Sequence, residues 1–346
     1  WMFFTYLLWG SICYTGINIP YGSMASAISD NPTDRTSLSN WRTIGATLAQ
    51  TAIGVVLPLV VYYTDEAGNS VLSGQKMMLG ALVCSIGAVI CYMLCYKMTT
   101  ERVKVGQNTQ KFSFGELIKE LAHNRSLIGI IVCALVFLLA QLSLSNMNAY
   151  IYPNYFGNIK AMSIASLSGT IVILLTFITK LASKIGKKEL SVIGCIISAA
   201  SFITLFIIHT HNVWIWIALI IIATIGTSMF NMVIWAMITD VIDESEVQNG
   251  VRQDGTIYSV YSFARKLGQA CSSGLAGVLL SIVGYTTATA FDPKVIDGIY
   301  NVTCLMPAAG MTLLLLALIF IYPLNKKRVE ANAAKLKEIR AAKEQQ

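Results

Sequence analysis

The feature that most constrains this chain is a series of nine long apolar segments. Each is about the length that an α-helix needs to cross the hydrocarbon core of a bilayer, roughly 20 residues. No strand-like alternation recurs along them, so the sequence predicts an all-α integral membrane protein rather than a membrane barrel. The predicted spans are 2–28, 42–63, 74–97, 126–150, 162–183, 189–209, 213–239, 254–285 and 299–323.

The composition also places the chain in the membrane class. Hydrophobic residues make up 55% and charged residues 12% of its 346 residues, whereas charged residues are about 25% of an ordinary soluble domain. The net charge of +7 does not indicate a nucleic-acid partner, because the basic residues lie mostly in the loops between apolar segments. We recognise no nucleophile–base pair, metal-ligand cluster or phosphate-binding loop in the sequence, so we expect neither an enzyme nor a bound metal.

Lysine and arginine are divided unequally between the two sets of loops. Alternate loops and the C-terminal tail contain twenty of them, and the opposite set contains three, Lys76, Lys160 and Lys294. Basic residues accumulate in the cytoplasmic loops of membrane proteins. The richer set and the tail are therefore predicted to be cytoplasmic, and we expect the chain in the plasma membrane.

The longest polar segment, about 98–125, divides the spans into three and six. Nine spans with a cytoplasmic tail place Trp1 outside, and three further spans would give twelve. Trp1 also opens directly inside an apolar segment, so we expect an N-terminally truncated fragment. The predicted parts are half of an N-terminal bundle in 1–97, a central cytoplasmic loop in 98–125, a C-terminal six-helix bundle in 126–324 and a cytoplasmic tail in 325–346.

The first span carries polar side chains in the stretch CYTGINIPYGSM, residues 13–24. Tyr14 and Asn18 are four residues apart, and Thr15 and Asn18 are three apart, so they share a helix face. Trp9 lies about one and a half turns earlier. Hydroxyl, amide and aromatic groups on one stripe suit a sugar, which offers C–H faces for stacking and hydroxyls for hydrogen bonds. The alternative interpretation is helix-packing contacts with an interfacial tyrosine.

Arg265 and Lys266 lie about a dozen residues into the span 254–285. An ionisable residue inside the membrane is costly and is a functional candidate by default. No Asp or Glu lies well inside the predicted spans, so we expect these cations to face a wet cavity and to find their carboxylate partner outside this chain. The alternative is a helix that starts late, with both charges near the cytoplasmic surface.

Two blocks of sequence resemble a known family. The first is YLLWGSICYTGINIPYGSM followed by DNPTDRTSLSNWRTIGA, and the second is MITDVIDESEVQNGVRQDGTIYSVYSFARKLGQA. They are similar to helices IV–V and X–XI of the glycoside–pentoside–hexuronide:cation symporters, the melibiose permease group of the major facilitator superfamily. The resemblance covers essentially the whole chain and implies helices IV–XII of a twelve-helix transporter.

The resemblance also implies roles by position. The Thr that helps to coordinate the coupling cation in the melibiose permease corresponds to Thr15. An Asp that binds the galactoside is Asn18 here, and a sugar-contacting Trp is Asn231. The family's main cation-binding carboxylates are on helix II, outside this chain. Together with the stripe described above, the expected substrate-binding residues are Trp9, Tyr14, Asn18, Arg42, Asn231, Ser262, Arg265 and Lys266.

The implied activity is symport of a glycoside, pentoside or hexuronide with Na⁺ or H⁺ by alternating access of two helix bundles. The coupling cation is the only cofactor expected, and the expected partners are a small sugar and the lipid bilayer, with the chain acting as a monomer. Arg42, Arg265 and Lys266 also suit a carboxylate-bearing substrate. The alternatives are a carrier of lysolipids or other amphiphiles with the same fold, and a sugar sensor that does not transport.

Overall fold

The computed structural model describes residues 1–14, 16–17, 21, 28, 32–64, 70–100, 124–167, 182, 184–249 and 254–344. The chain divides into two compact units. The first comprises residues 1–53 and 73–112, and the second comprises residues 54–72 and 113–346.

The first unit is helical. It contains α1 (Met2–Leu7), the π-helical turn η1 (Leu8–Cys13), the first part of α3 (Pro32–Val61) and α4 (Gly74–Met98). The α4 helix begins where the Ser73 hydroxyl accepts a hydrogen bond from the backbone N–H of Lys76. None of the 25 residues of α4 is buried, so this apolar helix suits a hydrocarbon environment.

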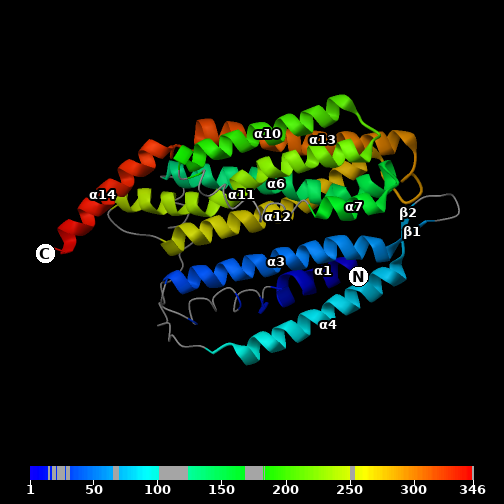
Figure 1. Ribbon diagram of the computed structural model, residues 1–346, viewed down its shortest axis with the longest axis horizontal. Coiled ribbons are helices and arrows are strands. Elements are labelled where there is room, and N and C mark those ends of the chain that lie inside the picture. Colours follow the sequence, from blue (N-terminus) through cyan, green and yellow to red (C-terminus); the bar gives the residue numbers. More distant parts are fainter. Residues whose placement is uncertain are drawn as a thin grey trace. The chain divides into compact units, whose positions relative to one another are not determined.

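The second unit is a helical bundle with a small hairpin at one end (Figure 1). The hairpin pairs β1 (Tyr62–Thr64) with β2 (Ser70–Leu72) in antiparallel register, with Tyr63 opposite Val71. The helices are α6 (Arg125–Tyr150), η2 (Ile151–Tyr155), α7 (Ile159–Ser166), α10 (Lys187–Ile208), α11 (Val213–Asn249), α12 (Asp254–Val283), α13 (Pro293–Leu316), η3 (Ala317–Ile321) and α14 (Lys326–Glu344).

Seven helices of the described residues are long and apolar enough to cross a membrane. They match seven of the nine predicted spans, and the other two predictions, 2–28 and 162–183, fall partly on residues outside the described ranges. An all-α membrane fold is thereby confirmed. The hairpin was not predicted, because strands of three residues are too short to show an alternating pattern. The seven spans are Ile44–Val61, Gly74–Met98, Arg125–Tyr155, Lys187–Ile208, Val213–Gln248, Val260–Val283 and Pro293–Ile321.

Two apolar clusters form the core of the second unit. The cluster toward α14 contains residues of α6, α10, α11, α12 and α13, with Phe137 edge-on to Phe230 at 4.9 Å between ring centroids. The cluster toward the hairpin end is more aromatic and includes the fully buried Trp216 and Tyr300. The Tyr300 hydroxyl donates to the Leu205 carbonyl at 2.7 Å and accepts from the Thr210 N–H at 3.2 Å, so its polar tip is satisfied inside an apolar region.

The α10 and α11 helices cross at a pair of glycines. A Cβ placed on Gly194 would collide with the carbonyl group of Gly226, and one placed on Gly226 would lie 2.5 Å from the Gly194 carbonyl oxygen. Small residues let helix backbones approach closely in a membrane, where packing rather than water exclusion drives association. These two positions therefore set how close the two helices lie.

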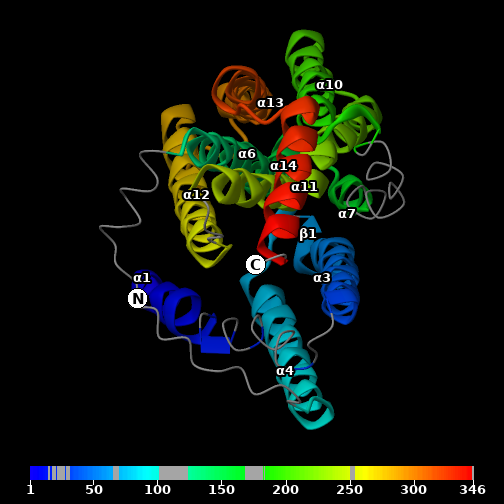
Figure 2. The same ribbon diagram turned by 90° about the vertical axis from the view of Figure 1, so that its left-hand side faces the viewer.

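Figure 2 views the molecule from the end that carries α14. Charged side chains hold α14 and the neighbouring helices together at this end. The buried carboxylate of Glu244 on α11 contacts the Ser126 hydroxyl and the Arg328 guanidinium of α14. Asp240, also on α11, pairs with Lys187 of α10 at 2.6 Å. A buried carboxylate is tolerated when it is paired and hydrogen-bonded, so these contacts explain how α11 can carry acids at this end and remain packed.

Basic side chains at the same end cap the carbonyls that close η3. Arg125 donates to the Phe320 carbonyl at 3.0 Å, and Lys188 donates to the Tyr322 carbonyl at 2.7 Å. Cations near the last carbonyls of a helix satisfy groups that have no partner within the helix. The Asn325 side chain then accepts from the Arg328 N–H at 2.9 Å and starts α14.

We predict that Gly194→Ala lowers the thermal stability of the protein in detergent, by about 1–3 kcal/mol, because the new methyl group overpacks the crossing with Gly226. The matched control is Gly277→Ala, where an added Cβ meets nothing within 4 Å. Equal melting temperatures for the two variants would show that the glycine crossing does not limit packing.

We also predict that Arg328→Gln destabilises the docking of α14, by roughly 1–3 kcal/mol, because it leaves the buried Glu244 carboxylate without its cation. Limited proteolysis of α14 and thermal unfolding are the measurements. The control is Glu330→Gln, which removes only an exposed pair with Lys326 at 3.8 Å and should change stability by less than about 0.5 kcal/mol. If α14 becomes protease-sensitive in both variants alike, the buried pair is not what holds it.

Candidate functional site

The most informative polar group inside a span is the guanidinium of Arg265 on α12. It lies 5.2 Å from the ring centroid of Trp235 on α11 and 5.9 Å from that of Tyr261 on its own helix. Both distances are within the range of a cation–π contact, which contributes about 0.5–1 kcal/mol at exposed sites and about 2 kcal/mol or more when desolvated. The two rings meet edge-to-face, 5.3 Å apart at 73°, so they form a corner that receives the cation.

Local and tertiary geometry both contribute to this corner. Tyr261 precedes Arg265 by four residues, and side chains at that spacing are neighbours on a helix surface. Trp235 comes from the helix before it in sequence, and α11 and α12 pack against each other. Tyr261 is 1% exposed whereas Trp235 is 44% exposed, so one wall of the corner is fixed in the core and the other is open.

The position of Arg265 along α12 agrees with a location inside the membrane. It lies within the span Val260–Val283, five residues after the first residue of that span. At 1.5 Å per residue this is about 7.5 Å along the axis. Stacking on aromatic faces is a property of the planar, delocalised guanidinium, and it explains how a half-buried arginine is stabilised in a span, Val260–Val283, that contains no Asp or Glu.

Lys266, the next residue, is exposed and has an interaction partner in the structure. The expectation that both cations find their carboxylate partner outside this chain stays a prediction. Arg265 is stabilised by rings, which a search for acids alone does not detect.

The remaining predicted residues of the second unit lie one helical turn from these groups. Ser262 is half-buried and precedes Lys266 by four residues on α12, and Asn231 is exposed and precedes Trp235 by four on α11. Each pair shares one helix face. The hydroxyl and the amide thus extend the surface around Arg265 with hydrogen-bonding groups.

The first unit places two predicted aromatic residues together. The rings of Trp9 and Tyr14 lie 6.3 Å apart at 38°, and both side chains are exposed. The wide π-helical turn η1 ends just before Tyr14, and such turns are frequent at functional sites. Arg42 lies over the ring of Tyr21 at 5.1 Å. Thr15 and Asn18 lie outside the described residues.

Sequence reasoning missed Trp235, Tyr261 and Tyr21 as partners of the arginines. A partial signal existed for Tyr261, because an aromatic residue four positions before an intramembrane arginine can reach it on the helix surface. Nothing local connects Trp235 with Arg265, which is thirty positions later in the chain. That contact depends on how α11 and α12 are rotated against each other.

Comparisons with known proteins agree with these observations. A family model described as MFS/sugar transport protein matches residues 1–326. The chain is 31% identical over 329 residues to an uncharacterized symporter, YjmB, of Bacillus subtilis strain 168, covering 94% of this chain and 70% of that protein. It is 29% identical to a glucuronide carrier protein homolog of Escherichia coli K12, with the same coverage.

A third relative is the isoprimeverose transporter of Lactiplantibacillus pentosus, 26% identical over 94% of this chain and 68% of that protein. The match of the family model to almost the whole chain, together with seven helices of membrane-spanning length, confirms the expected superfamily. It also confirms that the protein is a multi-pass membrane transporter and not an enzyme. The chain belongs to the MFS/sugar transport protein family of the major facilitator superfamily.

Proposed function

We propose that this protein imports an acidic glycoside, a hexuronide or a sugar of similar charge, together with Na⁺ or H⁺ by alternating access. The observation that carries the proposal is the Arg265 guanidinium held against Trp235 and Tyr261 inside a membrane span. Stacking uses the faces of the guanidinium and leaves its edge of N–H donors for a bidentate carboxylate.

The groups around Arg265 suit the rest of such a substrate. Trp235 is partly exposed and offers an aromatic face to the C–H side of a sugar ring. Asn231 and Ser262 carry the amide and hydroxyl that pair with sugar hydroxyls. Lys266 adds a second positive charge. Trp9, Tyr14 and Arg42 of the first unit offer aromatic, hydroxyl and cationic groups, and their expected role in substrate binding stays a prediction.

The named relatives point to the same chemistry. One is a glucuronide carrier homologue and another a putative sulfoquinovose importer, both of Escherichia coli K12, and glucuronide and sulfoquinovose are acidic sugars. The isoprimeverose transporter of Lactiplantibacillus pentosus has a neutral sugar in its name. We place this chain with the acidic group because Arg265 and Lys266 are adjacent and Arg265 is free of any described carboxylate contact.

We assign the α14 end of the second unit to the cytoplasm of a cell whose plasma membrane holds the protein. Hydrogen bonds from Arg125 to the Phe320 carbonyl and from Lys326 to the Lys184 carbonyl gather basic residues at this end. Among the described helices of the second unit, Lys160 and Lys294 are the lysines at the opposite end. The imbalance follows the positive-inside rule.

Coupling is the thermodynamic part of the proposal. A cation that binds better when the sugar site is formed tightens sugar binding by the same factor by which the sugar tightens cation binding. We assign Thr15 as one ligand of that cation. The cation gradient then supplies the free energy for accumulating the substrate, and no covalent step is needed.

The test of function is uptake of labelled glucuronide into proteoliposomes under an imposed Na⁺ gradient, an imposed proton gradient, or neither. We expect accumulation with one of the two gradients and none without. Binding without accumulation would identify a sensor. Uptake of lysolipid with no response to sugar would identify an amphiphile carrier, and either result contradicts the proposal.

For the substrate site, we predict that Arg265→Lys lowers kcat/KM for glucuronide about tenfold, equivalent to ~1.4 kcal/mol, because lysine keeps the charge but loses the planar donor edge. Arg265→Met should lower it further, whereas uptake of a neutral glycoside should change less. Arg125→Lys, at the α14 end, is the control and should leave kcat/KM within about twofold. Normal glucuronide uptake by Arg265→Met would rule out the assigned role.

A second prediction concerns the aromatic wall. Trp235→Phe should retain most glucuronide uptake and Trp235→Ala should lose about tenfold, because the ring face stabilises both the cation and the sugar. The comparison is made at equal amounts of folded protein, measured by fluorescence-detected gel filtration. If Phe and Ala behave alike, the ring face is not what position 235 contributes.

A further inference from the structure

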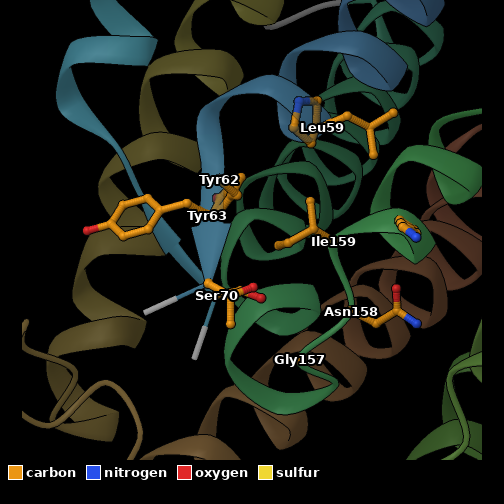
Figure 3. Close-up of a pocket in the computed structure, with 10 residues that line it drawn as sticks. Leu59, Tyr62, Tyr63, Ser70, Gly157, Asn158 and Ile159 are labelled. Atoms are coloured by element: carbon orange, nitrogen blue, oxygen red, sulfur yellow. The ribbon is translucent and has the colours of Figure 1, made fainter. Parts of the chain in front are cut away.

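A polar pocket lies at the hairpin end of the second unit, which is opposite α14 in Figure 1. Figure 3 shows this pocket in close-up. Its volume is about 270 Å³. The hairpin and the preceding end of α3 form one side, and the turn between η2 and α7 forms the other. All of these residues belong to the second unit.

Contacts between the two sides hold the pocket in shape. The Tyr62 hydroxyl donates to the Ala149 carbonyl at 3.4 Å, and the Ser163 hydroxyl donates to the Val55 carbonyl at 2.9 Å. Burial and the nearby Tyr285 and Tyr150 raise the pKa of Tyr62, so this hydroxyl remains a neutral donor. These hydrogen bonds therefore hold the two sides of the pocket together.

The pocket combines an apolar wall with hydrogen-bond donors. Pro58, Leu59 and Ile159 contribute the apolar wall. Figure 3 shows the Tyr63 ring turned away from Ile159 and Asn158, so this ring is not part of that wall.

The polar lining is rich in donors. Asn158 uses its side-chain oxygen to accept from the Ala161 N–H at 3.1 Å, which leaves the amide NH₂ as the group it can offer to a ligand. The ammonium of Lys160 supplies three more donors and a positive charge, and Ser70 supplies a hydroxyl. Among the described residues, no carboxylate lies within ion-pair distance of Lys160.

A lysine is also unusual at this end of the molecule. Arg125, Lys187, Lys188 and the start of α14 place positive charge at the other end, as the positive-inside rule requires. Lys160 departs from that pattern at the rim of a pocket, whereas Lys294, the other described lysine at this end of the second unit, is not part of the lining. Electrostatic attraction of an anion from solution is the physical effect that such a placement provides.

We propose that this pocket is an outer binding site for the acidic sugar, with its carboxylate at Lys160 and the C–H face of its ring against Pro58, Leu59 and Ile159. The volume is that of about nine water molecules at ~30 Å³ each, which is the scale of one sugar ring. The site gathers substrate at the outer mouth of the transporter before it reaches Arg265. This inference rests on the proposed function and adds a second site to it.

The test compares Lys160→Met, Lys160→Arg and Lys294→Met with the wild type in glucuronide uptake by full-chain proteoliposomes. We expect Lys160→Met to raise KM roughly three- to tenfold, as for one charge-assisted contact at a partly exposed site, with the maximal rate unchanged. Lys160→Arg and Lys294→Met should resemble the wild type. High salt should remove the difference between Lys160→Met and the wild type, and uptake of a neutral glycoside should be unaffected.

Several outcomes would overturn the outer site. They are an unchanged KM in Lys160→Met, an equal rise in Lys294→Met, or an equal effect on a neutral glycoside. If only the outer site is wrong, the wild type still takes up glucuronide and the variants do not show the expected differences. If the proposed function is wrong, the wild type itself takes up no acidic sugar.

Two further arms identify what the lysine binds. Uptake is compared in vesicles of phosphatidylcholine alone and in vesicles that also contain phosphatidylglycerol, which separates binding of the sugar carboxylate from binding of a lipid phosphate. A rise in KM for Lys160→Met that is seen only with phosphatidylglycerol would contradict the proposal.

Asp65 and Glu66, between the hairpin strands, lie outside the described residues. If Lys160 serves only to neutralise them, Lys160→Met should have no effect in the Asp65→Asn, Glu66→Gln background, whereas a sugar-binding lysine should still raise KM there.

Discussion

The absence of water in the hydrocarbon core of a membrane is the constraint from which the structure follows. A backbone amide there must be hydrogen-bonded within the protein, and a helix achieves this along its whole length. The long spans of this chain are helical for that reason. The same constraint applies to charged side chains, which are costly inside a span unless another group pairs with them or water reaches them.

The described residues meet this constraint in two ways. At the α14 end, acids of α11 are paired with cations, as in Asp240 with Lys187 and Glu244 with Arg328. Inside α12, Arg265 lies against the rings of Trp235 and Tyr261 instead. A carboxylate partner would occupy the donors of the guanidinium, whereas aromatic rings stabilise its charge through the faces. The second arrangement therefore suits a site that must accept and release an anion.

The two ends of the second unit differ in the same physical terms. The α14 end is rich in basic residues that cap helix carbonyls, and its contacts stabilise the bundle. The hairpin end holds an aromatic core and a braced pocket with a lysine at its rim. Between the two ends, α10 packs closely on α11 at Gly194 and Gly226. A transporter of sugars needs both properties, a rigid bundle and polar groups that face a passing substrate.

The membrane class, most of the spans and the family could be predicted without a structure, because apolar length and contiguous motifs are local properties of the chain. The same reasoning identified Arg265 as a cation within a predicted span. Its aromatic partner could not be predicted, since Trp235 is distant in sequence and reaches Arg265 through the rotation of α11 against α12. The continuation of α11 to Asn249, past the predicted end at 239, has the same cause: its acids are stabilised by Lys187, Ser126 and Arg328 from other elements. Long-range contacts of this kind depend on helix register and rotation, which no short stretch of sequence specifies.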